Sequence, residues 1–439
     1  MRIDFTQLVR RARIGARRLW LTYGVFWVGA ILVGLVAVAY AKLVDGAFAL
    51  FSLAVGYAAW LPLLITPAIG VAAVWLTRRY FPGSEGSGIP QVIATVKSSE
   101  PERRDALLSL RVMVGKILVS TLGMLGGYTI GREGPSVHIG AAVMYTMRRA
   151  YPRSSSRIDR QFIVAGGAAG LAAAFNTPLA GVIFAFEEIN KNFEQRTSGT
   201  LITAILFAGI VALAIAGDYN YFGRIQVPQE YPPHLVIAVL CTGLVTGLSG
   251  GAFGWLMLNL ARWVPARLRA LRSDRPYRFA LLCGVVLALL GVASGGITFG
   301  SGYREAQALL SDHESVSILY APLKAAALLI TYLVGMPGGI FAPTLSIGAG
   351  VGQLVGLVFP EVPLSALIAL AMVGYLAAVT QAPITSFVIM MEMTDGHGMM
   401  IALMATAVIA STLSKAMTPP LYESLARAYL GPLAEPARR

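Results

Sequence analysis

The sequence predicts an all-α polytopic membrane protein, a bundle of tilted and broken helices built from two inverted repeats. Its composition is the first observation: 56% of the 439 residues are hydrophobic and only 13% are charged, whereas soluble domains average about 25% charged residues. A spanning helix needs roughly 20 apolar residues. Such stretches recur at 25–42, 47–76, 161–186, 200–216, 234–260, 279–293, 320–334 and 362–391.

The positive charge is concentrated beside the apolar spans. Arginines cluster in residues 1–22, which lack a signal-peptide cleavage site and which we expect to form a cytoplasmic amphipathic helix. A second cluster, at 262–278, also flanks a span, so the positive-inside rule places both in the cytoplasm. The sequence leaves the side of a third basic run, 148–160, open. The net charge of +13 does not indicate nucleic-acid binding, because no folded basic domain with stacking aromatics is present.

The chain divides into two halves. We expect a first membrane repeat at 23–216, a polar link at 217–233, a second repeat at 234–425 and a short cytoplasmic tail at 426–439, with no appended regulatory domain. Long apolar spans open each half, and a glycine-broken segment comes next: "GREGPSVHIGAA" in the first and "GGIFAPTLSIGAG" in the second. Interrupted segments at matching places are typical of inverted-repeat transporters with a binding site at mid-membrane.

Three segments have the composition of helix starts: "GSEGSGIPQ" (83–91), "GREGP" (131–135) and "GGIFAP" (338–343). Each places a proline where the first helical turn accepts it. The unpaired N–H groups of a helix start, together with its partial positive charge, bind anions. Three converging starts would hold an anion without a lysine, which keeps binding weak enough for release. The alternative is that the glycines only allow close helix packing; their symmetric placement favours the site.

Arg132 and Glu133 lie inside this apolar context, where an ionisable residue is a functional hypothesis. A carboxylate among free amides is stabilised as the anion, while desolvation and neighbouring anions favour protonation. Glu133 could therefore titrate as anion occupancy changes. An Arg132–Glu133 salt bridge is the alternative, which is weakened because adjacent helix residues point apart. Arg132 then supplies positive potential or structural hydrogen bonds near an outer entrance.

The motifs together resemble the CLC family of chloride channels and transporters over nearly the whole chain. "GSGIP", "GREGP", "AAAFNTPLAGVIFAFEE", "GGIFAP" and "PPLYESL" occur in the family's order. The resemblance implies a multi-pass membrane protein, a homodimer with one pathway per subunit, and chloride and protons as its partners besides lipid. It implies no cofactor and no metal. Lacking G-x-S-x-G and HExxH motifs, the chain is not expected to be an enzyme.

The resemblance also assigns residues to the anion pathway. Ser87 and Tyr422 match the hydroxyl donors of a central chloride site, which the backbone amides of Ile340 and Phe341 complete. Lys116 matches a lysine that raises the positive potential near the path, with snorkelling to the interface as the alternative. The outer site would be formed by backbone amides at Arg132, Glu133, Gly134 and Ala342.

Two acids decide the expected mechanism. Glu133 matches the gating glutamate, and Glu188 matches the internal proton-transfer glutamate, with Glu187 bordering the water path to it. Without the resemblance, the pair at 187–188 would also suit helix caps or contacts with Lys191. Both acids together predict an H+/Cl− antiporter; a passive, voltage- or pH-gated chloride channel on the same fold is the alternative. A bacterial inner membrane with both termini cytoplasmic is the expected location.

Two positions depart from members of the family that carry acids there: Gln91 and Ile93. Both changes remove buried charge but leave the anion site unaltered, and the sequence does not indicate their effect. Serine rather than proline at 87 favours chloride over nitrate. Ser87 together with Tyr422 argues against a fluoride exporter.

Overall fold

The computed structural model describes residues 23–151, 155–191, 198–217, 221–223, 233–311 and 316–431. Throughout these ranges the regular structure is helical, and the only bridge between extended residues pairs Gly131 with Gly339. The amphipathic helix expected at 1–22 lies outside the described residues. So do most of the expected link at 217–233 and the end of the expected tail, 432–439.

The first half of the chain contributes helices α2 to α10. Their bounds are α2 Val25–Tyr57, α3 Pro62–Arg79, α4 Ile89–Lys97, α5 Pro101–Leu107, α6 Leu110–Leu125, α7 Glu133–Met147, α8 Ser156–Phe175, α9 Pro178–Phe184 and α10 Ser198–Ala216, with the π-turn η3 at Ala185–Ile189.

The second half contributes α11 to α20. Their bounds are α11 Pro233–Trp263, α12 Ala266–Asp274, α13 Pro276–Ala293, α14 Tyr303–Leu310, α15 Tyr320–Val334, α16 Phe341–Gly356, α17 Leu364–Thr380, α18 Pro383–Thr394, α19 Met400–Met417 and α20 Leu421–Ala428.

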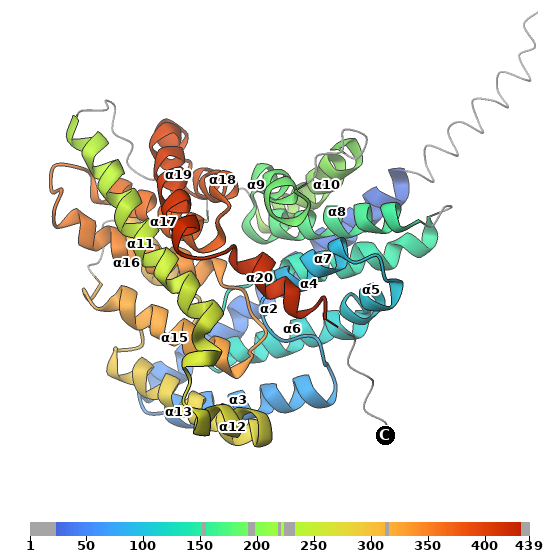
Figure 1. The fold of residues 1–439 in the computed structure, drawn as a ribbon, viewed down its shortest axis with the longest axis horizontal. Coiled ribbons are helices and arrows are strands. Elements are labelled where there is room, and N and C mark those ends of the chain that lie inside the picture. Colours follow the sequence, from blue (N-terminus) through green and yellow to red (C-terminus); the bar gives the residue numbers. More distant parts are fainter. Residues whose placement is uncertain are drawn as a thin grey trace, which may run out of the picture.

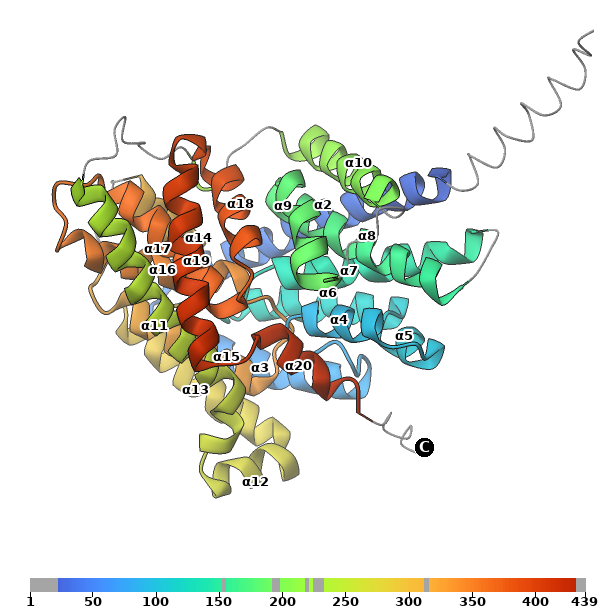
Figure 2. The same cartoon turned by 45° about the horizontal axis from the view of Figure 1, so that its top comes forward.

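The two halves lie side by side, as the colours of Figure 1 show: the blue-to-green helices occupy one side and most of the yellow-to-red helices the other. The first half contacts the second where α3 packs on α13, α9 on α18 and α7 on α16. The C-terminal helix α20 reaches across this border and packs on α4, as Figure 2 also shows. Segments from opposite ends of the chain therefore meet at the centre.

Within the described residues, six helices are long and apolar enough to cross a bilayer. Others are shorter, so their ends lie inside the bundle, where non-helical backbone is tolerated only if buried or lining a cavity. The six are Val25–Tyr57, Pro101–Leu125 (α5 and α6 taken together), Gly199–Ala216, Pro233–Trp263, Pro276–Ala293 and His397–Met417.

The boundary expected between spans 25–42 and 47–76 was wrong. Helix α2 continues through it to Tyr57, and the chain turns only at 58–61 before α3 begins at Pro62. Lys42 and Asp45, polar residues at this boundary, are exposed and line a cavity. Because their side chains are exposed rather than buried among apolar residues, these polar residues do not interrupt the helix.

Two expected spans are each broken into two helices. The stretch 161–186 contains the end of α8 at Asn176, with φ of 58°, and the start of α9 at Pro178. The stretch 362–391 breaks in the same way at Gln381, with φ of 59°, before α18 begins at Pro383. A left-handed residue ends a helix and proline starts the next one, and a hydropathy pattern does not register either signal.

Candidate ion-binding site

Three helix starts meet at the border between the halves. Gly131, ahead of α7, and Gly339, ahead of α16, exchange two backbone hydrogen bonds of 2.7 Å each. The N–H of Gly338 donates to the carbonyl of Gly86, ahead of α4, at 3.1 Å. The loops before α4, α7 and α16 are therefore held against one another, and the convergence expected from the sequence is present.

Glycine is required where these loops touch. A Cβ at Gly134 would lie 2.3 Å from the Ser87 Oγ and 3.2 Å from the Cα of Gly339. Gly88 has φ of +102°, a conformation that side chains rarely adopt. The close-packing interpretation of the glycines applies elsewhere, at the crossing of α7 and α8, where a Cβ on Gly140 would lie 2.2 Å from the carbonyl oxygen of Gly166. The glycines of this protein thus serve both purposes.

A cavity of about 130 Å³ borders these helix starts, and we call it the inner cavity. Ser87, Ile340 and Tyr422 line it. The Ser87 and Tyr422 hydroxyls are buried and close together, and neither makes a hydrogen bond of normal geometry with the described residues. The ring of Phe341 lies 5.8 Å from that of Tyr422. Unpaired buried hydroxyls are costly, so their convergence with a helix start is suited to an anion.

Glu133 is fully buried at the first residue of α7. It borders an outer cavity of about 570 Å³. Its carboxylate faces the backbone N–H groups of Glu133 itself and of Ala342, yet neither oxygen makes a hydrogen bond of normal geometry within the described chain. A carboxylate thus lies at backbone amides that the resemblance assigns to the outer anion site. The start of α16 beside it also contributes Ile340 to the lining of the inner cavity.

Arg132 forms its ion pair with Asp45 of α2, with 2.6 Å between Nη1 and Oδ2. Its guanidinium carbon lies 5.2 Å from the ring centroid of Tyr221. Arg132 and Asp45 both line the outer cavity. The position expected for Arg132 near an outer entrance stays a prediction; its guanidinium pairs with Asp45 at this cavity.

Lys116 is fully buried in α6, so the snorkelling alternative was wrong. Its Nζ donates to the carbonyls of Gly86, at 2.9 Å, and Glu85, at 3.3 Å. These carbonyls belong to the loop that ends at Ser87. Lys116 therefore fixes the loop that carries one hydroxyl donor. Its expected effect on the positive potential near the path stays a prediction.

Glu188 lies in η3 with 6% of its surface exposed. It lines a separate cavity of about 220 Å³, which we call the Glu188 cavity. The charged residues that share the lining come from four segments of the chain. They are Lys97, Arg160, Lys191 and Glu423.

Glu187 points away from this cavity and caps a helix. Its Oε1 and Oε2 accept hydrogen bonds from the backbone N–H groups of Ile384, at 3.1 Å, and Thr385, at 2.6 Å, in the first turn of α18. The contribution expected of Glu187 to a water path stays a prediction. Capping, which was the alternative for the pair at 187–188, holds for this acid.

The two departures from the family pattern are both accommodated. Gln91 is buried, and its Nε2 donates to the carbonyl of Glu85 at 2.7 Å, in the loop that Lys116 also holds. Ile93 is buried and lines the Glu188 cavity. Gln91 therefore supports the Ser87 loop, and Ile93 gives the Glu188 cavity an apolar wall.

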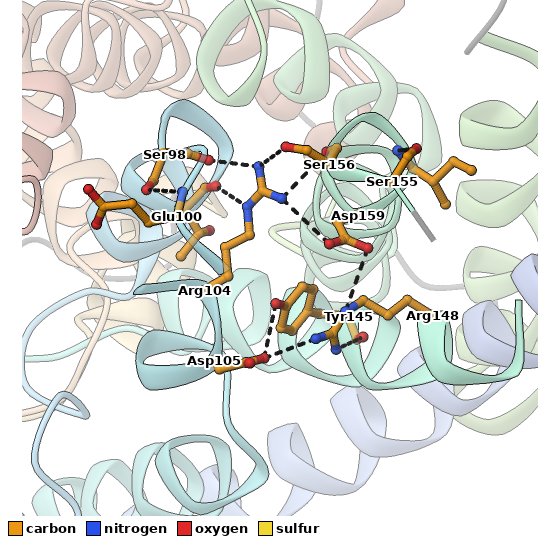
Figure 3. A network of polar contacts seen from close by, with 11 residues as sticks. Ser98, Glu100, Arg104, Asp105, Tyr145, Arg148, Ser155, Ser156 and Asp159 are labelled. Atoms are coloured by element: carbon orange, nitrogen blue, oxygen red, sulfur yellow. Dashed lines mark hydrogen bonds and ion pairs between the residues drawn. The ribbon is translucent and has the colours of Figure 1, made fainter. Parts of the chain in front are cut away.

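A polar network places the third basic run, as Figure 3 shows. Arg148 pairs with Asp105 at 3.0 Å and with Asp159 at 3.5 Å. Arg104, almost fully buried, donates to the carbonyl of Ser98 at 2.7 Å and pairs with Asp159 at 3.5 Å. The described parts of this run, 148–151 and 155–160, therefore lie near the end of α4, where Arg160 also lines the Glu188 cavity.

Comparison with known proteins settles the family. Residues 69–415 match the family described as voltage gated chloride channel. This chain belongs to the CLC family. It is a multi-pass membrane protein of that fold.

Solved CLC structures resemble the whole chain. A slow cyanobacterial Cl−/H+ antiporter has 25% sequence identity and a TM-score of 0.80, over 94% of this chain and 99% of that one. A CLC-type fluoride/proton antiporter has 20% identity and a TM-score of 0.76, over 90% and 95%. A eukaryotic CLC transporter has 21% identity and a TM-score of 0.74, over 93% and 74%. The latter two similarities show the shared fold alone.

Proposed function

We propose that this CLC protein moves chloride across the membrane in exchange for protons. The observation that carries the proposal is the pair of buried acids at opposite ends of the anion site: Glu133 at the outer cavity and Glu188 in the cavity on the other side. A passive conduit needs no second acid, whereas an acid at each end can take up and release protons on both sides of the protein. The similarity to a Cl−/H+ antiporter at 25% identity supports the same function.

Chloride would bind in the inner cavity between the Ser87 and Tyr422 hydroxyls and the backbone N–H groups of Ile340 and Phe341. Each donor is a dipole rather than a full charge, so the site stabilises an anion without trapping it. Lys116 adds a buried positive charge behind the Ser87 loop. The outer site would use the amides at the starts of α7 and α16.

Glu133 would act as the gate. As an anion, its carboxylate occupies the amides of the outer site and excludes chloride. Once protonated, it loses its attraction for the helix starts and can move into the outer cavity, which it already borders. Chloride then takes its place. Each exchange of carboxylate for chloride is therefore linked to a proton.

Glu188 would exchange protons with water on the inner side. A proton that reaches Glu133 from Glu188 allows chloride to occupy the outer site, and its release to the outer cavity returns the carboxylate. Chloride and protons therefore cross in opposite directions. The N- and C-termini would be cytoplasmic, in a bacterial inner membrane.

The protein would be a homodimer with one pathway in each subunit. Large apolar side chains are exposed on α9, α10, α18 and α19, a surface available to a second subunit or to lipid. They include Leu179, Leu206, Ile210, Ile384, Ile401 and Val408.

Proteoliposomes distinguish the antiporter from the channel. With a chloride gradient as the sole energy source, we expect uphill proton movement whose direction reverses with the gradient. Glu188→Gln is the matched control: chloride flux should continue while proton movement stops. Wild-type chloride flux without uphill proton movement would contradict the antiporter and support the passive channel.

A further inference from the structure

Glu423 joins three segments at the inner mouth of the protein. Its Oε1 lies 2.6 Å from the Nζ of Lys97, at the end of α4, and its Oε2 lies 2.9 Å from the Nζ of Lys191, just after η3. Glu423 itself is in the first turn of α20. All three residues line the Glu188 cavity. We call this set the inner bridge.

The inner bridge connects the anion site to the proton site. Glu423 is next in sequence to Tyr422, whose hydroxyl faces the inner cavity, and Lys97 ends the helix that begins just after Ser87. On its other side, the bridge faces Glu188. One carboxylate therefore lines the cavity of the acid proposed to carry the proton and is adjacent in sequence to a residue proposed to bind chloride.

Charged groups from several elements surround Glu188, and positive charges outnumber negative ones. Lys97 of α4, Arg160 of α8 and Lys191 line the cavity with positive charge, and Glu423 of α20 lines it with negative charge. Glu187 of η3 lies outside the lining but is next to Glu188 in the chain and adds negative charge near it. Asp159 of α8 is directed to Arg104 and Arg148. Because Glu187 caps α18, Glu423 is the acid that pairs directly with cavity lysines.

Glu423 remains an anion throughout the working pH range. Hydrogen bonds from Lys97 and Lys191 lower the pKa of its carboxyl to about 2. It cannot itself pass protons near neutral pH. Its effect on Glu188 is that of a fixed negative charge, which offsets one of the two positive charges of Lys97 and Lys191.

We propose that Glu423 is a positioning residue for proton transfer, because it offsets part of the positive charge of Lys97 and Lys191 and so allows Glu188 to take a proton from inner water. This inference rests on the proposed antiport. Without Glu423, the unpaired lysines would hold Glu188 as an anion and reduce proton entry. Opposite charges within a few ångströms shift proton binding by about one pH unit or more.

The test uses charge-balanced variants in proteoliposomes. Glu423→Gln should reduce proton movement per chloride at least threefold near neutral pH and shift the inner pH midpoint for proton movement about one unit lower. Lys97→Met should shift the midpoint upward. The double variant Lys97→Met with Glu423→Gln restores the net charge around Glu188, so we expect a midpoint near that of the wild type, although the ion pair is absent.

The outcomes separate the inference from the proposed function. Wild-type protein that moves no protons uphill contradicts antiport itself. Wild-type coupling with an unchanged midpoint in both single variants overturns the inference and leaves antiport standing. If the double variant fails as badly as Glu423→Gln, the bridge has only a structural role, and the inference is wrong. If Glu423→Gln does not fold, Lys97→Met tests the inference alone: an upward shift of the midpoint supports it, and an unchanged midpoint contradicts it.

Discussion

Two fully buried lysines hold matching loops in the two halves of this protein. Lys116 of α6 donates to the carbonyls of Glu85 and Gly86, ahead of α4. Lys324 of α15 donates to three carbonyls ahead of α14, at 3.0 Å each: those of Thr298, Phe299 and Gly300. An ammonium that satisfies several buried carbonyls fixes an irregular loop inside the bundle.

The two loops end in different contacts. The loop held by Lys116 ends at Ser87, whose hydroxyl lines the inner cavity. The loop held by Lys324 ends at Gly302, whose carbonyl accepts a hydrogen bond from the Ser346 hydroxyl at 2.9 Å. A buried lysine therefore holds each loop. In the first half the loop carries the Ser87 hydroxyl, which makes no hydrogen bond of normal geometry with the described residues, and in the second half it carries a carbonyl that is hydrogen-bonded to Ser346.

The helix caps repeat this correspondence. Glu187 of the first half caps α18 of the second, and Glu392 of the second half caps α9 of the first by accepting from Leu179 and Ala180, at 3.1 and 2.7 Å. Glu392 thus has a structural role, and the helix it caps belongs to the other half. These reciprocal caps join α9 to α18 at the border between the halves.

The paired helix starts show where the halves diverge. Gly131 and Gly339 have equivalent backbones, joined by their mutual bridge. The next residues are Arg132 and Glu133 in one half but Ile340 and Phe341 in the other. The backbone and anchors are alike, whereas the ionisable side chains are present on one side only. We infer that scaffold is shared between the halves and that the gate is particular to the first.

The largest expected effect is at Glu133. Glu133→Gln should leave chloride flux but abolish uphill proton movement and the pH dependence of flux, because an amide cannot exchange a proton or compete as an anion. Glu392→Gln, in the other half, is the control and should keep coupling. Proton coupling that survives in Glu133→Gln would contradict the gate.

The second largest effect is expected at Gly134, the residue after Glu133. In Gly134→Ala, a methyl group would approach the Ser87 Oγ, so we expect chloride binding to weaken about tenfold, the effect of moderate overpacking. The matched position in the other half is already Ala342, and Ala342→Gly should bind chloride nearly as the wild type does. Calorimetric titration with chloride measures both. Equal losses in the two variants would show that the Ser87 contact is irrelevant.

The buried lysines separate stability from binding. Lys116→Met and Lys324→Met should each lower the free energy of unfolding by about 3 kcal/mol, because buried carbonyls lose a charged donor. Only Lys116→Met should also weaken chloride binding. Thermal unfolding in detergent and chloride titration provide the two readings. A loss of chloride affinity in Lys324→Met as large as in Lys116→Met would remove the distinction between the loops.

The smallest effects concern the reciprocal caps. Glu187→Ala and Glu392→Ala should each cost about 1 kcal/mol of stability, the usual value of a helix cap. If Glu187 also borders the water path, only Glu187→Ala should slow proton movement in proteoliposomes. Equal rates of proton movement in the two variants would show that Glu187 acts only as a helix cap.

The sequence predicted the membrane class, the fold and the helix starts, because composition and Gly–Pro placement are local signals. Other features depended on contacts between distant segments. Asp45 meets Arg132 from 87 positions away, and Glu423 meets Lys97 from 326. Spacing along the chain carries no record of such pairs. The breaks at Asn176 and Gln381 were missed because apolar residues continue on both sides of each break.

The central claim is that converging helix starts and two hydroxyls, rather than a lysine or arginine, hold the anion. Anomalous diffraction from crystals soaked in bromide tests it most directly. We expect a bromide peak between the Ser87 and Tyr422 hydroxyls and the N–H groups of Ile340 and Phe341, with a second peak at the carboxylate position in Glu133→Gln. Bromide found only beside the Lys116 ammonium or the Arg132 guanidinium, with none between the hydroxyls, would contradict it.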